Sequence, residues 1–582
     1  MSSQPPAPLL FGFDFGTSRT KAFGIGSDPQ NPSNTTNSTF DVPTRRLKLS
    51  NAKRIFQLYT RDPQILQKFQ NQSFFGCELT LDQTKRVVYK VDKDRLDAYP
   101  PSVVTKKIID KALDQFFTNI ATEGSLFVVL TTPVDFAPQQ CSALIRIVEL
   151  HAKQPQVIAV VPEPIAATIK HMNMTVLNAN TEQNVIVVDF GAGTLDLSAV
   201  KVRYDNASTL TFHVEEIDGE RSFGGSNFTT KLMQLYKTKF VRAMNKWISQ
   251  SQRFSTTQAR EAFRTLFTVW LDEQLNRMEP IVEEKKTNYF SKLQAGGSVD
   301  LELDAVMADG ETVPPEILAY LKDAPEDAKR QSVTFEEWQA CVTELMGTPE
   351  TSTQDTFMGK VDSFVKKCQA NPHLAGNMTV LLVGGAFRVP SVVATCKAFF
   401  AKVPNCTVRD ENVDNDLVLA EGAKIFGDAL MKGKDAKGRK LVVQSIVPRD
   451  IGVMLDETTF QPVVPKGQVV LFSQVQGAPV TSVTGRVTLI NCNQPLRYEL
   501  GITQTTRVAL RLFELISAET SQLRPLFDFT PALLQETLDP NNHLFLTCKV
   551  NDIGIFVFEL HDSFGRLIGS NEGEQNEIVW LM

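Results

Sequence analysis

Two stretches of the chain repeat the same order of apolar and polar positions. Apolar runs over residues 9–13 and 185–188 each lead into an aspartate, which is followed by a turn of glycine and hydroxyl residues. After each turn, apolar positions resume over residues 21–25 and 195–200. Apolar runs bounded by small residues indicate a strand, a turn and a second strand. The sequence therefore predicts two β-hairpins of the same design.

The two predicted turns suit a phosphate group, because glycine lets backbone amides approach an anion closely and hydroxyl groups add donors. The residues of these types are Gly16, Thr17, Ser18, Gly191, Gly193 and Thr194. Asp14 and Asp189 stand at the mouths of the turns and would repel a phosphate directly. Two such carboxylates imply a hydrated Mg²⁺ between them and the anion. An ordinary tight hairpin is the alternative for either copy alone, but the repetition makes that alternative weaker.

Beyond the hairpins, the chain divides into two parts. From residue 9 to about 433, short β-rich runs alternate with helical patterns over residues 104–117, 141–151 and 227–249, which indicates an α/β architecture. After Val447, strands are predicted and long helical patterns are nearly absent. The predicted strands cover residues 468–472, 486–490, 506–512 and 543–550.

The predicted domain boundaries follow from this change and from a basic, glycine-rich string, MKGKDAKGRK, at residues 431–440. We expect a domain over residues 1–430, a linker over 431–446 and an all-β domain over 447–582. Residues 295–330 mix glycine, proline and acidic residues, and they are predicted to be an irregular surface insertion.

Composition narrows the classes of function. A net charge of −6 without a massed basic segment gives no support for nucleic-acid binding. The eight cysteines have no CxxC or zinc-type spacing, so they are predicted to be free thiols in a reducing compartment. No apolar run reaches the ~18 residues of a membrane span, and the N-terminus shows no signal sequence. We therefore expect a cytoplasmic protein that does not enter a membrane.

Three further strings complete a pattern. VVPEPIAATIKH places Glu163 before a proline that opens a helix, and LLVGGAFRVPSV places Gly384 and Gly385 between an apolar strand and Arg388. NDLVLAEGAKIFG is an amphipathic helix that begins near Asp416. Together with DFGTSRTK and DFGAGTLDLS, these strings resemble in order and spacing five motifs of the actin, hexokinase and heat-shock-chaperone ATPase superfamily. The chain has no GxxxxGK phosphate loop, which is consistent with this different plan.

Within that superfamily the chain most resembles the seventy-kilodalton heat-shock chaperones of the DnaK type. NAKRIF at Asn51, TTPVDFAPQQ at Thr131 and RSFGGSNF at Arg221 are similar to strings of that family. VVQSIVPRDIGVM at Val442 and FLTCKVNDIGIFVFELHD at Phe545 extend a looser similarity past the ATPase part. The resemblance implies a two-lobed, actin-like ATPase domain of α/β class followed by an all-β domain like a substrate-binding domain.

The resemblance also implies roles for residues. Asp14 and Asp189 would hold the hydrated Mg²⁺, with Glu163 joining through water. Lys53 in the AKR string would position the attacking water and neutralise charge on the transferred phosphoryl group. Thr194 completes the catalytic set. The remaining predicted contacts to ATP or ADP are Gly16, Thr17, Ser18, Arg19, Lys21, Gly191, Ala192, Gly193, Asp196, Gly224, Gly225, Glu283, Lys286, Gly384, Gly385, Ala386, Arg388 and Asp416.

Alternatives remain for single residues. Lys53 on its own is as consistent with a solvated helix lysine, and Glu163 with a carboxylate at a helix start. Lys21 follows Asp14 by seven residues, the spacing of a phosphate-contacting lysine in actin, where heat-shock chaperones usually have a small residue. We hypothesise that Lys21 adds a cation near the β-phosphate, and a strand lysine that points outward is the alternative.

Some positions depart from the family pattern. Cys141 stands where the family has an arginine that relays the nucleotide state to the linker, although Pro133 of the same relay is kept. Ala386 and Phe387 replace a Ser-Thr pair beside adenosine. The helical lid that follows the β module in typical members is expected to be missing.

The resemblance implies an ATP-dependent chaperone that binds unfolded or nascent polypeptides and hydrolyses ATP slowly. Its implied partners are a J-domain co-chaperone and a nucleotide-exchange factor, and we expect a monomer or a subunit of a hetero-complex. A regulatory co-chaperone of the ribosome-associated type, which keeps ATP with little hydrolysis, is the closest alternative. A small-molecule kinase or an actin-like filament protein is a further one, which the β module and the AKR string disfavour.

Overall fold

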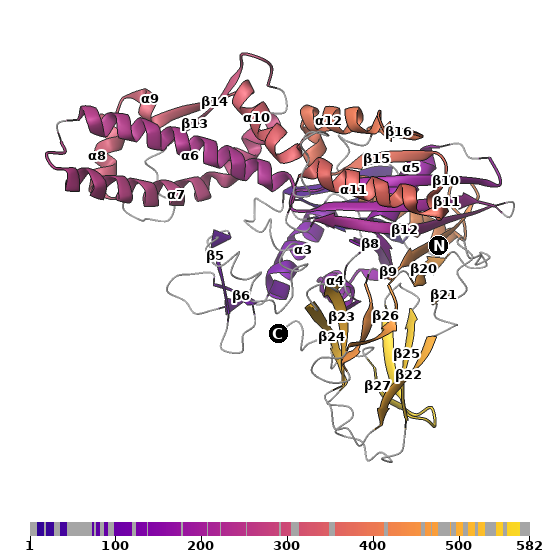
Figure 1. The fold of residues 1–582 in the computed structure, drawn as a ribbon. Coiled ribbons are helices and arrows are strands. Elements are labelled where there is room, and N and C mark those ends of the chain that lie inside the picture. The colour runs from indigo at the N-terminus through magenta and orange to yellow at the C-terminus, as the bar shows by residue number, and fades with distance from the viewer. Residues whose placement is uncertain are drawn as a thin grey trace, which may run out of the picture.

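The protein is described here by a computed structural model, which covers residues 8–570 with gaps. The longest gaps are residues 44–72, 304–312, 348–355, 475–488 and 530–542. Figure 1 shows two mixed β-sheets with helices on them, a long helical arm that projects to one side, and a group of strands near the C-terminal end of the colour scale. The α/β architecture predicted for the first part of the chain is thus confirmed.

The first sheet begins with an antiparallel meander and ends with two parallel strands. Its order is β3 (Thr35–Pro43), β2 (Arg19–Ser27), β1 (Leu9–Phe15), β8 (Leu126–Thr132) and β9 (Gln156–Pro162). Every residue of β1 is buried, because helices cover both faces of the sheet there. The helices α3 (Pro101–Thr118) and α4 (Pro138–Glu149) pack on one face, through side chains such as Phe116 and Leu144.

The second sheet repeats this order and then continues beyond it. The repeating strands are β12 (Thr209–Glu220), β11 (Leu195–Tyr204), β10 (Thr181–Phe190), β15 (Met378–Val383) and β16 (Cys406–Arg409). As in the first sheet, the first three strands are antiparallel and the last two are parallel. Beyond β12 the sheet adds β17 (Lys440–Ile446), β20 (Val469–Gln474) and β21 (Leu489–Ile490). The two hairpins therefore hold the same place in two copies of one strand arrangement.

Two helices each follow a strand of one sheet and pack on the other sheet. Helix α5 (Glu163–Met174) follows β9 of the first sheet but packs on β10 and β11 of the second. Helix α13 (Val418–Lys432) follows β16 of the second sheet but packs on β1 and β8 of the first. Where the two helices meet, a Cβ added to Gly422 would lie 1.9 Å from the carbonyl oxygen of Ala166, so only glycine permits this contact.

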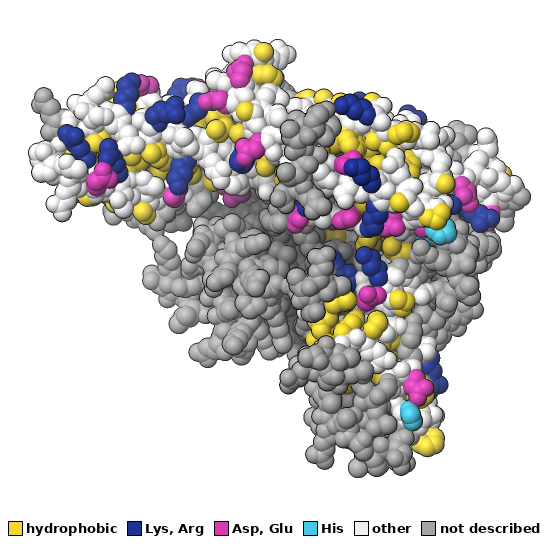
Figure 2. Space-filling model, in the orientation of Figure 1, with side chains coloured by type: hydrophobic (Ala, Val, Ile, Leu, Met, Phe, Trp, Pro, Cys, Tyr) yellow, Lys and Arg dark blue, Asp and Glu magenta, His cyan; other side chains and the backbone are white. Residues whose placement is uncertain are grey.

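The helical arm is built by α6 (Gly225–Gln250) and α7 (Thr257–Asn288), which run side by side in Figure 1. The remaining elements of the arm and of the adjoining helical layer are β13 (Ser298–Glu302), α8 (Pro315–Asp323), α9 (Glu326–Lys329), β14 (Arg330–Thr334), α10 (Phe335–Met346), α11 (Phe357–Ala370) and α12 (Pro390–Phe400). Figure 2 shows charged side chains of both signs interspersed over this arm.

The prediction of an irregular surface insertion at residues 295–330 is wrong. Described residues of this stretch form β13, α8 and α9, and the side chains of Ile317 and Tyr320 are completely buried in the largest core cluster. The glycines and prolines that suggested a loop instead separate short elements, between which single apolar residues reach the core.

All elements described after Val447 are strands. One sheet has the order β19 (Phe460–Val464), β18 (Ile451–Met454), β23 (Arg511–Ser517) and β24 (Gln522–Asp528), and another has β22 (Leu496–Thr503), β25 (His543–Val550), β26 (Phe556–His561) and β27 (Leu567–Ser570). A further small sheet comes from β4 (Ser73–Phe74), β5 (Cys77–Leu81), β6 (Val87–Lys90) and β7 (Ala98–Tyr99). Of the segment predicted as a linker, residues 440–446 form β17, which pairs in parallel with β12. The predicted division into domains stays a prediction.

None of the helices in the described ranges is both long and apolar enough to cross a bilayer.

Candidate functional site

The first hairpin places a buried carboxylate beside an ammonium group. Asp14 on β1 and Lys21 on β2 are directly opposite in the antiparallel register, and Lys21 Nζ lies 3.2 Å from Asp14 Oδ2. Asp14 is only 1% exposed, and its Oδ1 also accepts a hydrogen bond of 3.4 Å from the Thr131 hydroxyl on β8. Lys21 therefore points toward Asp14 and not outward from the strand. Gly16 lies in the turn, Arg19 begins β2, and Thr17 and Ser18 lie outside the described residues.

The second hairpin places two carboxylates opposite each other. Asp189 on β10 pairs with Asp196 on β11 in the register, at the positions that Asp14 and Lys21 occupy in the first hairpin. The turn between them is closed by the Gly191 N–H, which donates to the Thr194 carbonyl at 3.0 Å. The Thr194 hydroxyl donates to Asp196 Oδ2 at 2.8 Å, which fixes the orientation of that carboxylate.

The start of α6 packs directly on this turn. The Gly225 N–H donates to the Gly191 carbonyl at 2.9 Å, and the Ser226 N–H donates to the Ala192 carbonyl at 2.7 Å. A Cβ added to Gly224 would lie 2.5 Å from the Ala192 carbonyl oxygen, so the approach needs glycine. The predicted contacts Gly191, Ala192, Gly193, Thr194, Gly224 and Gly225 are therefore brought together.

The end of β15 reaches the same place from the other side. Gly384 has a φ of 102°, and a Cβ there would lie 2.6 Å from Asp189 Oδ1 and 2.5 Å from the Phe190 carbonyl oxygen. Gly385, Ala386 and Arg388 follow in a short 3₁₀ turn, in which Ala386 is buried and Gly385 is exposed. This segment thus contacts the second hairpin, as the predicted site requires.

Lys286 and Glu283 on α7 connect this helix to the start of α6. The Lys286 side chain is 5% exposed and makes an ion pair with Glu283 Oε2 at 2.7 Å. Its ammonium also donates to the Gly225 carbonyl at 2.6 Å and to the Thr229 hydroxyl at 3.1 Å. Glu283 accepts a hydrogen bond from the same Thr229 hydroxyl. Lys286 therefore contacts Gly225, and Glu283 joins it in a network with Thr229 between the two helices of the arm.

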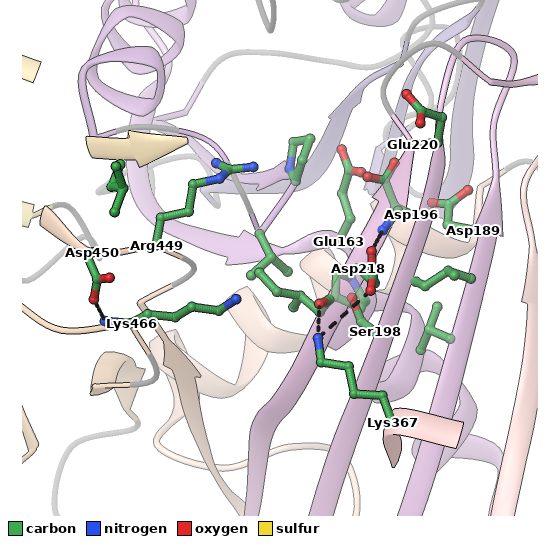
Figure 3. A pocket seen from close by; sticks show the side chains of 18 residues that line it. Glu163, Asp189, Asp196, Ser198, Asp218, Glu220, Lys367, Arg449, Asp450 and Lys466 are labelled. Atoms are coloured by element: carbon green, nitrogen blue, oxygen red, sulfur yellow. Dashed lines mark hydrogen bonds and ion pairs between the residues drawn. The ribbon is translucent and has the colours of Figure 1, made fainter. Parts of the chain in front are cut away.

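A cavity of about 330 Å³ opens beside the second hairpin, between the second sheet and the strands that follow β17 (Figure 3). Its lining includes Glu163 at the start of α5, together with Asp189 and Asp196. Figure 3 shows Arg449 and Lys466 pointing toward these carboxylates from the opposite side. The cavity therefore has an acidic wall from the second sheet and the start of α5, and it receives Arg449, Asp450 and Lys466 from connections between the strands near the C-terminal end.

Several residues of the cavity were not predicted. Asp218 and Glu220 on β12 extend its acidic wall, and Lys367 on α11 makes an ion pair with Glu216 at 3.2 Å. The acidic run EEIDGE at residues 215–220 was a signal for the wall in the sequence. The basic residues Arg449 and Lys466 are distant in the chain and follow no local pattern.

The described residues contain no group of three or more His, Cys, Asp or Glu side chains that could hold a metal ion by direct contact. Glu163, Asp189 and Asp196 nevertheless line one cavity, whereas Asp14 lies on the first sheet. The predicted catalytic lysine, Lys53, and the predicted nucleotide contact Asp416 lie outside the described residues.

Cys141 lies in α4 and is 7% exposed, within the core cluster of the first sheet. The other described cysteines are also free thiols, and burial raises the pKa of Cys368 to about 12. Pro133, the retained member of the predicted relay, lines the cavity. A buried thiol cannot replace the charge of an arginine at position 141.

Two comparisons with known proteins agree. The sequence model of the family described as Hsp70 protein matches residues 42–266 and 357–498, more than half of the chain. The chaperone protein DnaK of Thermotoga neapolitana is 24% identical over 418 residues, which cover 70% of this chain and 59% of the relative. A heat shock protein of Pyricularia oryzae is 25% identical over 315 residues, which cover 54% of this chain and 41% of the relative. The chain thus spans less than two thirds of the length of the curated relatives it matches.

Proposed function

The chain belongs to the Hsp70 family, and on that premise we propose that it is a chaperone that binds ATP with Mg²⁺, hydrolyses it slowly and binds unfolded or nascent polypeptides. The observation that carries the proposal is the second hairpin, where Asp189 and Asp196 face each other across the strands. Glu163 lines the same cavity. This arrangement is the one that the family resemblance requires on the metal side of a nucleotide.

These three carboxylates fit a hydrated Mg²⁺, because that ion prefers oxygen ligands and keeps several of its waters. An ion held through water needs no cluster of directly coordinating side chains. Bound Mg²⁺ would neutralise charge on the β- and γ-phosphate oxygens. Asp189 and Asp14 would hold the ion from the two hairpins, Glu163 would join through water, and Asp196 would orient its outer shell.

The turn of the second hairpin would receive the β- and γ-phosphates, together with the turn of the first. Its backbone is held in place by hydrogen bonds from Gly225 and Ser226, so the site is ordered before a ligand arrives. Thr194 is anchored through Asp196. The amides of Ala192 and Gly193 and the hydroxyls of Thr17 and Ser18 would supply further donors.

The adenosine would lie between two groups of residues that meet at Gly225. On one side are Gly384, Gly385, Ala386 and Arg388, and on the other is the Glu283–Lys286 pair, which fixes α7 against α6. Asp416, which precedes α13 in the sequence, would be a further contact to the nucleotide. Lys53 would position the attacking water and neutralise charge in the transition state.

The strands after Val447 would form the polypeptide-binding module, which would take apolar extended segments beside its strands. Strand β17 supports coupling between this module and the nucleotide site, because it is hydrogen-bonded both to β12 and to β20. A J-domain co-chaperone and a nucleotide-exchange factor would be partners in the cycle. The free, buried thiols support a reducing compartment such as the cytoplasm.

A regulatory co-chaperone that retains ATP with little hydrolysis is the second candidate. The observation that favours it is Cys141, which is buried in the first core where the family pattern has a relay arginine. Without that charge, nucleotide state and polypeptide binding would be coupled less tightly. The carboxylates of the second hairpin favour hydrolysis.

Single-turnover hydrolysis of bound ATP, with and without an unfolded apolar peptide, tests the proposal. The wild-type protein should bind ATP in the presence of Mg²⁺ and release phosphate, and the peptide should accelerate the release. Asp189→Asn and Lys53→Ala should each slow hydrolysis by at least about 100-fold, in the range seen when a group that stabilises transition-state charge is removed.

Lys106→Met is the matched control, because it removes an ion pair with Asp110 on α3 that lies outside the proposed site. It should leave the rate unchanged. Tight retention of ATP without turnover in the wild type would favour the regulatory candidate, and a failure to bind ATP at all would refute both.

A further inference from the structure

Lys21 is the feature of the site that the second hairpin does not share. Its side chain is 16% exposed, and its ammonium lies 3.2 Å from the nearly buried carboxylate of Asp14. The antiparallel register sets the two residues directly opposite each other, so the pair is fixed by backbone pairing and not by a flexible surface contact.

The same register in the second hairpin gives the opposite electrostatic result. Asp189 faces Asp196, so the mouth of that hairpin carries two carboxylates where the first carries a carboxylate and an ammonium. Two facing carboxylates repel a polyphosphate and favour a divalent cation between them and the anion. A neutralised carboxylate does not repel the anion in this way.

We propose that Lys21 serves as a built-in counter-cation for Asp14, so that a nucleoside diphosphate binds with only partial dependence on Mg²⁺. The inference rests on the proposed nucleotide site and adds a residue that sets its metal requirement. Lysine acts on phosphate as a point charge, so its effect does not require a forked, bidentate geometry. The low exposure of the pair protects it from screening by salt.

The position of Lys21 also limits how Asp14 can serve a metal. The ammonium beside Asp14 Oδ2 reduces the negative charge that this oxygen offers to a hydrated cation. Asp14 would therefore contribute less than Asp189 to holding a bound Mg²⁺, and Lys21 would supply charge balance at the first hairpin.

Calorimetric titration with ADP, in excess Mg²⁺ and in excess EDTA, tests the inference on the full chain. For the wild-type protein we expect removal of Mg²⁺ to raise the Kd by less than about tenfold, and for Lys21→Met by at least about 100-fold. Lys21→Arg keeps the charge and should retain the wild-type ratio. Lys106→Met, which removes a part-buried lysine–aspartate pair on α3, should also retain it.

The wild-type ratio alone is decisive if Lys21→Met does not fold. A wild-type Kd that rises 100-fold or more in EDTA would overturn the inference, and so would equal ratios for the wild type and Lys21→Met. ADP binding by the wild type in Mg²⁺ is the separate test of the proposed function. If that binding is absent, the proposed site itself is refuted, and this inference with it.

Discussion

The two hairpins share a backbone plan and differ in the charges it carries. In each, an aspartate is the second-last residue of the first strand, and the residue seven positions later lies opposite it, as Lys21 opposite Asp14 and Asp196 opposite Asp189. One residue in each hairpin therefore decides whether the mouth is balanced or doubly negative. Two copies of one strand arrangement thus carry different charges at the same position of the hairpin.

The residues that pair with the two aspartates on the neighbouring parallel strands also differ in polarity. Asp14 lies beside Thr131 on β8, which donates a hydrogen bond to it, whereas Asp189 lies beside Val383 on β15. The first carboxylate therefore has polar partners on both adjacent strands. In the register, the residues that pair with Asp189 on the adjacent strands are Asp196 and Val383.

The largest expected effect is on stability without nucleotide or metal. Asp14→Asn removes the carboxylate that lies 3.2 Å from the largely buried Lys21 ammonium, and it should lower the free energy of unfolding by about 3 kcal/mol. Asp189→Asn removes one of two facing carboxylates and should leave that free energy unchanged or raise it by up to about 1 kcal/mol. Urea unfolding of both variants measures the difference, and equal losses would contradict the comparison.

The next effect concerns how β15 holds the second aspartate in place. Gly384→Ala puts a side chain at a φ of 102° and against the Phe190 carbonyl oxygen. It should lower the free energy of unfolding by about 2 kcal/mol. Gly385→Ala is the matched control, since a Cβ there meets nothing within 4 Å. If thermal unfolding gives the same loss for both variants, Gly384 does not approach the Phe190 carbonyl oxygen this closely in solution.

A smaller effect is expected when the second hairpin is given the charges of the first. Asp196→Lys places an ammonium opposite Asp189, and ADP affinity in EDTA should rise about tenfold, or 1.4 kcal/mol. Asp218→Lys changes the same cavity wall without facing Asp189, and it should change that affinity less than about threefold. Calorimetry separates the two, and equal gains would mean that total charge matters and register does not.

The smallest effect compares the two threonines. Thr194 donates to Asp196 at 2.8 Å, whereas Thr131 donates to Asp14 at a longer 3.4 Å. Thr194→Val should therefore cost about 1 kcal/mol of unfolding free energy and Thr131→Val less than about 0.5 kcal/mol. A larger loss for Thr131→Val, measured by urea unfolding, would show that the first aspartate depends on its hydroxyl partner more than on Lys21.

Much of the fold around the hairpins could be predicted, because it is encoded locally. The apolar runs and glycine turns indicated both hairpins, and the predicted helix at residues 227–249 differs by two residues or fewer at each end from α6. The direction of Lys21 could not be predicted from alternation alone, because a strand lysine fits either face. The hairpin register decides it, and register depends on the turn as well as on the strands.

The cavity could not be predicted from local sequence patterns. Its basic side depends on Arg449 and Lys466, which reach the acidic wall only because β17 joins the second sheet. The stretch at residues 295–330 misled for a related reason. Its turn residues are conspicuous, while the burial of Ile317 and Tyr320 depends on packing against the distant helices of the arm.

The crossing of α5 and α13 at Gly422 has a mechanical consequence. Because the backbones touch there, the two helices can neither approach further nor slide without a clash, so the crossing acts as a fulcrum. On the side away from this contact, each helix packs on the sheet opposite to the one whose strand it follows. We expect any motion of the two sheets against each other to turn about this contact, because the helices have no room to approach further there.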